Sequence, residues 1–236
     1  MSITTILFDL DGTLLPMDQD LFIATYLKKL VTYLAPYGYD PKELGDMIWR
    51  GTAAMIKNDG RASNETVFWK TFCAHYGEEA IKDEAIFDRY YHTDFQSAKA
   101  VCGYTERAAK LISDLKARGI RLILATNPLF PAIATESRVR WARLEPCDFE
   151  YITTYDNSTF CKPNPEYYRE LIEKLGLNVD ECLMIGNDVS DDMIAEKLGM
   201  KVFLLTDCLI NTKNVDITQY PNGDFDKLEE YLKNSL

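Results

Sequence analysis

Short runs of apolar and β-branched residues recur along the chain and predict the strands of a buried sheet. These runs cover residues 3–8, 121–125, 151–154, 182–185 and 202–205. Each run is nearly continuous rather than alternating, which is typical of parallel strands covered by helices on both faces. The pattern therefore predicts a parallel sheet at the centre of the fold.

Apolar stripes with the helical period lie between these runs. One stripe passes through residues 108–115 and ends near Gly119, and another begins at Pro165 and ends at Gly176. Further helices are predicted over about 190–198 and 224–232. Strands that alternate with helices predict right-handed βαβ units and an α/β fold with a doubly wound parallel sheet.

The stretch from residue 16 to residue 99 breaks this alternation. Apolar positions between residues 23 and 34 repeat at the helical period, and Asp40-Pro41 is typical of a cap and first turn. Helical patterns continue to about residue 90, and no strand is predicted. We therefore expect an all-helical insert at 16–99 within an α/β core formed by 1–15 and 100–236.

Composition and charge restrict the class of partner. Hydrophobic residues make up 47% of the 236 positions and charged residues 27%, a normal mixture for a globular protein. The formal net charge of −11 repels a phosphate backbone, so nucleic acid is not expected as a partner. Small phosphorylated molecules remain compatible, because a local cation can reverse the sign of one pocket.

Nothing in the sequence predicts export or membrane insertion. The six cysteines are scattered without a Cys-x-x-Cys pair, which favours reduced thiols over a zinc site or a disulfide framework. No apolar run approaches the ~20 residues of a membrane span, and the first residues lack the basic lead of a signal peptide. We expect a cytoplasmic monomer or homodimer with no membrane partner.

Asp9 and Asp11 stand where the first apolar run ends. The same Asp-x-Asp spacing recurs at residues 18 and 20 and at residues 224 and 226, so the spacing alone carries no information. The context does: the preceding strand and the following Gly12-Thr13 put both carboxylates at the carboxyl end of a strand. Open α/β sheets bind their ligands there.

Asp188, Asp191 and Asp192 follow the run at 182–185 in the same way. If the two strands are neighbours, their carboxylates meet and repel by a few kcal/mol per pair at about 4 Å and an effective dielectric constant of about 20. A hard divalent cation relieves this repulsion, and Mg²⁺ is the natural choice beside phosphate. Asp191 is equally compatible with an ordinary capping role.

Two further segments could bind an anion. Thr126 and Asn127 follow the run at 121–125, where a hydroxyl and the amides of a starting helix suit a phosphate oxygen, although both are also common loop and cap residues. Lys162 precedes the helix that begins at Pro165. A cation is unfavourable at a helix N-terminus, so an anionic partner would explain it.

As a set, these segments resemble the four motifs of the haloacid dehalogenase superfamily, in the right order. The motifs are Asp9-Leu10-Asp11-Gly12-Thr13-Leu14, Thr126, Lys162-Pro163 and Gly186-Asn187-Asp188-Val189-Ser190-Asp191-Asp192. The helical insert is similar to the C1-type cap of this superfamily, which closes over the active site.

The resemblance implies roles for these residues. Asp9 would be the nucleophile that takes up a phosphoryl group, and Asp11 would protonate the leaving oxygen and then activate water. Thr126, Asn127 and Lys162 would hold the phosphoryl group. Mg²⁺ would bind Asp9, the backbone carbonyl of Asp11 and Asp188, with support from Asp192. An acid two residues after the nucleophile suits an alkoxide leaving group, which favours a phosphatase over a dehalogenase.

Some assignments stay open. The fourth motif reads Gly-Asn-Asp where many relatives have Gly-Asp, so Asp191 competes with Asp192 as the supporting carboxylate. Arg61, or Arg50 nearby, could meet a second anionic group of the substrate, although a solvated surface arginine is the simpler interpretation. The insert also carries His75 and His92, for which packing or surface roles are expected.

The expected activity is Mg²⁺-dependent hydrolysis of a small phosphorylated metabolite through an aspartyl-phosphate. A phosphomutase or phosphotransferase would use the same residues but pass the group to a sugar or alcohol. A phospho-accepting signalling switch also uses an acidic cluster, a threonine and a lysine on a parallel sheet. A general base beside the nucleophile hastens hydrolysis, which disfavours such a switch.

Overall fold

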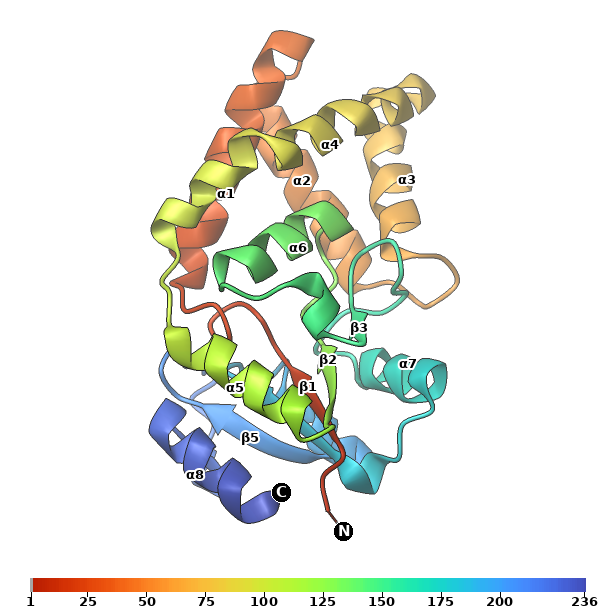
Figure 1. Ribbon diagram of the computed structural model, residues 1–236. Helices are drawn as coiled ribbons and strands as arrows, with labels where there is room; N and C mark the ends of the chain where they lie inside the picture. The colour runs from red at the N-terminus through yellow and green to blue at the C-terminus, as the bar shows by residue number, and fades with distance from the viewer. Residues whose placement is uncertain (1) are drawn as a thin grey trace.

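The computed structural model describes residues 2–236 and is built around a parallel sheet of six strands (Figure 1). The strands are β1 Thr5–Phe8, β2 Arg121–Leu124, β3 Tyr151–Ile152, β4 Cys182–Gly186, β5 Lys201–Leu205 and β6 Asn222–Gly223. Their spatial order is β3-β2-β1-β4-β5-β6. The predicted α/β class and all five predicted strands are confirmed. The edge strand β6 was not predicted, because an Asn-Gly pair carries no apolar signal.

Helices cover both faces of the sheet and one of its ends. The α-helices are α1 Gln19–Leu34, α2 Pro41–Ile56, α3 Asn64–Tyr76, α4 Glu84–His92, α5 Glu106–Ala117, α6 Ala132–Trp141, α7 Pro165–Leu175 and α8 Phe225–Ser235. Short 3₁₀ helices are η1 Ala35–Tyr37, η2 Glu78–Asp83, η3 Asp94–Val101, η4 Pro146–Asp148, η5 Val179–Glu181, η6 Met193–Leu198 and η7 Ile217–Gln219.

The strands alternate their side chains between two apolar clusters. Ile6 and Phe8 of β1 pack with α5 and α8, whereas Leu7 packs with α7 and η6 on the opposite face. This period-2 division within an unbroken apolar run is the expected signature of a strand buried on both sides.

Helices α1 to α4 form a separate layer beyond the carboxyl ends of the strands (Figure 1). From Gln19 to Val101 the structure contains helices and no strand, in agreement with the predicted helical character. Asp40 caps α2 as expected, because its Oδ1 accepts from the N–H groups of Lys42 and Glu43 at 3.0 and 2.9 Å. The division into a core (1–15 and 100–236) and an insert (16–99) stays a prediction.

The helix predicted over about 190–198 is only partly correct. Residues 189–192 form a turn, and a 3₁₀ helix begins at Met193. The Asp188 carboxylate accepts hydrogen bonds from the N–H groups of Ser190 and Asp191, at 2.6 and 3.0 Å. Side-chain acceptors of this kind compete with helical backbone bonding.

Helix α6 was not identified by its periodicity. It lies between the sheet and the layer formed by α1 to α4 (Figure 1), and its buried residues include Ala134, Ser137, Arg138, Val139 and Trp141. A helix covered on several sides has no polar stripe to produce an amphipathic pattern. Among residues 2–236, none of the helices combines the length and the apolar sequence needed to cross a bilayer.

Gly51 allows α2 and α3 to pack closely. A Cβ atom at this position would lie 2.6 Å from Cδ2 of Phe68, whereas the nearest atom to a Cβ at Gly45 of the same helix is 3.9 Å away. We expect Gly51→Ala to lower the free energy of unfolding by about 1–3 kcal/mol through overpacking. Gly45→Ala should leave it unchanged or raise it by about 0.5–1 kcal/mol. Urea unfolding followed by circular dichroism measures both, and equal effects would contradict this interpretation.

Candidate active site

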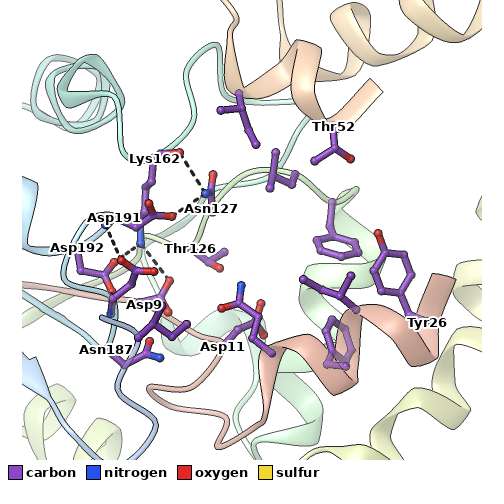
Figure 2. A pocket seen from close by; sticks show the side chains of 18 of the residues that line it. Asp9, Asp11, Tyr26, Thr52, Thr126, Asn127, Lys162, Asn187, Asp191 and Asp192 are labelled. Atoms are coloured by element: carbon purple, nitrogen blue, oxygen red, sulfur yellow. Dashed lines mark hydrogen bonds and ion pairs between the residues drawn. The ribbon is translucent and has the colours of Figure 1, made fainter. Parts of the chain in front are cut away.

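One pocket lies where β1, β2 and β4 end, beneath α1 and α2 (Figure 2). Phe8 of β1 is opposite Leu124 of β2 and Ile185 of β4, so the segments that follow these strands emerge at the same edge. The predicted residues that line this pocket are Asp9, Asp11, Thr126, Asn127, Lys162, Asp188, Asp191 and Asp192. Residues more than 150 positions apart in the sequence are thus brought together by the order of the strands.

Lys162 is the positive centre of this pocket. Its side chain is 1% exposed, and its Nζ donates to Oδ1 of Asp9 at 3.0 Å and to Oδ1 of Asp192 at 2.6 Å. Burial alone would lower the pKa of Lys162, but the Asp192 and Asp9 carboxylates raise it well above its ordinary value. The lysine is therefore a permanent charge that ties the loop after β1 to the loop after β4.

Asp9 is buried, and more of the charged groups near it are negative than positive. Burial raises its pKa to about 8, and although Lys162 opposes this shift, Asp192 and Asp11 add to it. Thr13 lies near its second oxygen, with the hydroxyl 3.5 Å from Oδ2. The Asp9 carboxylate is therefore held on one side by Lys162 and stabilised only weakly on the other.

Asp11 forms an ion pair with Arg138, a residue that was not predicted from the sequence. Arg138 projects from α6, its side chain is 1% exposed, and its Nη1 donates to Oδ2 of Asp11. The other oxygen, Oδ1, is buried without a hydrogen-bond partner. Burial raises the pKa of Asp11, while Arg138 and Lys162 act in the opposite direction. No sequence signal separates Arg138 from its neighbour Arg140, which lies on the same helix and is exposed.

The loop after β4 is organised by its own carboxylates. Oδ2 of Asp192 accepts from the N–H of Asp188 at 2.9 Å, so both oxygens of Asp192 are engaged. Gly186 makes this possible, because a Cβ atom there would collide with the Asp192 carboxylate. Asp191 instead faces the pocket, where its Oδ2 accepts from Nδ2 of Asn127 at 3.0 Å and burial raises its pKa to about 6.

Asn187 and Thr13 join the loops after β1 and β4. The Thr13 hydroxyl donates to Oδ1 of Asn187 at 3.0 Å. Gly12 adopts a φ of 84°, and any side chain there would strike the Asn187 amide. The Gly-Asn-Asp reading of the fourth motif thus has a structural role, since this asparagine fills the space beside Gly12.

The chemistry of the donors fits a magnesium ion. Across residues 2–236, no three His, Cys, Asp or Glu side chains are grouped so as to hold a metal by themselves. Mg²⁺ usually takes only one or two carboxylates together with phosphate oxygens and water. Asp9 and Asp188 both line the pocket and can supply carboxylate oxygens. These are hard oxygen donors in a pocket with excess negative charge.

The opposite wall of the pocket comes from α1 and α2 and was not predicted. Its members are Gln19, Phe22, Ile23 and Tyr26 of α1 and Trp49, Thr52 and Ile56 of α2. Their spacing along each helix is helical, but an apolar face of this kind cannot be distinguished in sequence from an ordinary core-facing stripe.

Arg50 and Arg61, expected as possible contacts to substrate, do not line the pocket. Arg50 follows Trp49 by one position, which turns it about 100° round the helix, toward a groove beside His75. Arg61 is 89% exposed and pairs with Asp59 at 3.3 Å. His75 lies 2.7 Å from Glu43 and His92 lies 3.6 Å from Asp88. Neither histidine lines the pocket, as expected.

The chain is similar to known proteins over most of its length. The chain is 27% identical over 203 residues to pyrophosphatase PpaX of Halalkalibacterium halodurans, covering 85% of this chain and 82% of that protein. It is 25% identical over 202 residues to a phosphoglycolate phosphatase of Caulobacter vibrioides, covering 86% and 78%. Among solved structures it resembles the putative hydrolase YfnB of Bacillus subtilis, determined with bound magnesium. There the TM-score is 0.60 at 21% identity, over 99% of this chain and 100% of the other.

The family model for haloacid dehalogenase-like hydrolases matches residues 3–199, which include all the predicted motif residues and the whole helical layer. The chain belongs to the haloacid dehalogenase-like hydrolases.

Proposed function

We propose that this protein is a Mg²⁺-dependent phosphatase that hydrolyses a small soluble phosphomonoester through an aspartyl-phosphate. The observation that carries the proposal is the pocket in which Asp9 and Asp11 lie beside the buried ammonium of Lys162. Relatives named pyrophosphatase and phosphoglycolate phosphatase support phosphorus as the reacting atom.

Asp9 is the nucleophile of the proposed reaction. Its carboxylate oxygen attacks phosphorus, and the bond from phosphorus to the leaving oxygen breaks as Asp11 donates a proton to that oxygen. In the second half, Asp11 takes a proton from water, whose oxygen attacks phosphorus and releases phosphate and Asp9. Dividing the displacement in two makes each step easier. The raised pKa of Asp11 suits a group that must carry the first proton.

Arg138 positions Asp11 in this scheme. It binds Oδ2, which leaves the unpartnered Oδ1 for the proton that moves. Its guanidinium is itself fixed by the Ala134 carbonyl at 3.3 Å and by the face of Phe130, 4.3 Å from the ring centre. A residue held on so many sides restricts Asp11 to one orientation.

The phosphoryl oxygens would be held from the side of β2 and Lys162. The backbone of Thr126 is anchored because its carbonyl accepts from the hydroxyls of Thr153 and Tyr167, at 2.6 and 3.0 Å. That anchoring presents the side chains of Thr126 and Asn127 to the pocket. Lys162 contributes a charge that attracts the phosphoryl group from a fixed position.

Asp9, the backbone carbonyl of Asp11, and Asp188 would hold the Mg²⁺. Asp192 would support them indirectly, because its oxygens are bound to Lys162 and to the N–H of Asp188. Bound there, the ion supplies positive charge to the phosphoryl oxygens and offsets the repulsion among the carboxylates.

Transfer to an alcohol or sugar uses the same first half of the reaction and differs only in the acceptor. Chromatography of the products formed with acceptor alcohols present separates the two: hydrolysis gives only free phosphate, whereas a transferase gives a new phosphomonoester.

We expect Asp9→Asn to abolish phosphate release from phenyl phosphate, because an amide cannot form the aspartyl-phosphate. Asp18→Asn is the matched control, since Oδ1 of Asp18 caps α1 at 2.9 Å from the N–H of Leu21 and asparagine caps equally well. A colorimetric phosphate assay measures both variants. Equal rates for Asp9→Asn and the wild type would refute the assignment.

Removal of divalent cations should suppress the same activity. We expect dialysis against EDTA to eliminate phosphate release and added Mg²⁺ to restore it, because the pocket carries more carboxylates than cations. Full activity after dialysis, with metal content checked by mass spectrometry, would contradict the metal requirement.

Arg138→Met should lower the free energy of unfolding by about 3–5 kcal/mol, because it leaves the buried Asp11 carboxylate unpaired. Arg140→Met, on the same helix, removes a pair whose arginine is 47% exposed and should have an effect below about 1 kcal/mol. The double variant Arg138→Met/Asp11→Asn should recover at least about 1 kcal/mol in urea unfolding. Equal losses for the two single variants would show that the buried pair does not stabilise the fold.

A further inference from the structure

The wall contributed by α1 and α2 carries no charged side chain toward the pocket. Its main members are Phe22, Ile23, Tyr26, Trp49, Thr52 and Ile56, and we call the space that they enclose above the carboxylates the leaving-group chamber. In Figure 2 Tyr26 and Thr52 lie across the pocket from Asp9 and Lys162. A phosphoryl group at Asp9 therefore directs the rest of its substrate into this chamber.

The positive charge of the pocket lies at the end opposite the leaving-group chamber, beside Asp9. Among the residues that the structure describes, Lys162 is the only cationic side chain that lines the pocket, and it is bound to Asp9 and Asp192. The Arg138 side chain is 1% exposed and already forms an ion pair with Asp11. An anionic group in the chamber would thus face five aspartates without a cation of its own.

Two large apolar side chains at the rim of the chamber are exposed to solvent. Trp49 is 52% exposed and Ile56 is 42% exposed, both on the face of α2 that lines the pocket. Exposed apolar side chains that gather at a concave surface mark a binding site for an apolar group. The Thr52 hydroxyl between them donates to the Ile48 carbonyl at 2.9 Å, so the polar group at this position is already engaged.

On the basis of the proposed function, we propose that the substrate is a phosphomonoester with an uncharged, apolar or aromatic leaving group. Substrates that bear a second anionic group are rejected. This separates the chain from relatives named for pyrophosphate and phosphoglycolate, because both of those compounds place a second anion beside the scissile bond.

The physical basis is a difference in desolvation. An aromatic or aliphatic group gains free energy when it leaves water for a chamber walled by Phe22, Tyr26 and Trp49. A carboxylate or phosphate in the same place loses hydration, meets no cationic side chain and is repelled by the aspartates below. Selectivity therefore arises from the repulsion of anionic groups as much as from the binding of apolar ones.

The experiment compares substrates that share the reacting atoms. Phenyl phosphate and 4-carboxyphenyl phosphate both release a phenol, and they differ by one carboxylate at the far side of the ring. With Mg²⁺ present, we expect kcat/KM to be at least about 30-fold higher for phenyl phosphate. Ethyl phosphate should likewise exceed phosphoglycolate, and pyrophosphate should be poorer than phenyl phosphate.

A cation placed in the chamber should weaken the preference for phenyl phosphate. We expect Thr52→Arg to narrow the ratio between the two aryl phosphates by at least about tenfold. Ala53→Arg adds the same charge to an exposed neighbouring position of α2 that does not line the pocket, and it should leave the ratio unchanged.

The outcomes distinguish this inference from the proposed function. Preference for 4-carboxyphenyl phosphate, phosphoglycolate or pyrophosphate, with activity that Asp9→Asn abolishes, overturns the inference and leaves the phosphatase in place. Equal effects of Thr52→Arg and Ala53→Arg also overturn it. Turnover that survives Asp9→Asn, or none with any of these substrates, overturns the proposed function and the inference together.

Discussion

The placement of β1 beside β4 is the constraint on which the rest of the structure depends. Both strands continue into acidic loops, so the sheet brings like charges together at one edge. Lys162 balances two of those charges and Arg138 balances a third, each from a side chain that is 1% exposed. A buried carboxylate without such a partner costs several kcal/mol. The groups that would perform the chemistry are therefore also the groups that hold this edge together.

The sheet and the helical layer contribute different kinds of side chain to the pocket. The sheet edge supplies charge, fixed by hydrogen bonds within the loop after β4 and from Lys162, before α7, to that loop. The helices supply apolar surface, from α1 and α2, with α6 lying between the two layers. A molecule with one charged end and one apolar end can enter this arrangement in only one orientation, which is the first requirement for attack at a single atom.

The sequence could predict the elements whose patterns are local. The strands β1, β2 and β4 followed from their nearly continuous apolar runs. The acidic or polar residues directly after them followed from the rule that ligands bind at the carboxyl ends of parallel strands. Arg138 could not be predicted, because its partner Asp11 is 127 positions away and its helix is covered on several sides. Whether Arg50 lines the pocket could not be decided from the sequence, because adjacent positions on α2 face different directions and the distinction requires the orientation of the helix.

The aromatic surroundings of Arg138 have a consequence for altering the substrate range of this protein. Its guanidinium lies 4.3 Å from the ring centre of Phe130 and 5.9 Å from that of Phe22, and both rings also line the pocket. Replacing either ring to reshape the cavity would therefore disturb the anchor of Asp11 at the same time. Trp49 and Ile56, on α2, have no such contact. Directed evolution toward new substrates should find independent changes on α2 and coupled ones around α6.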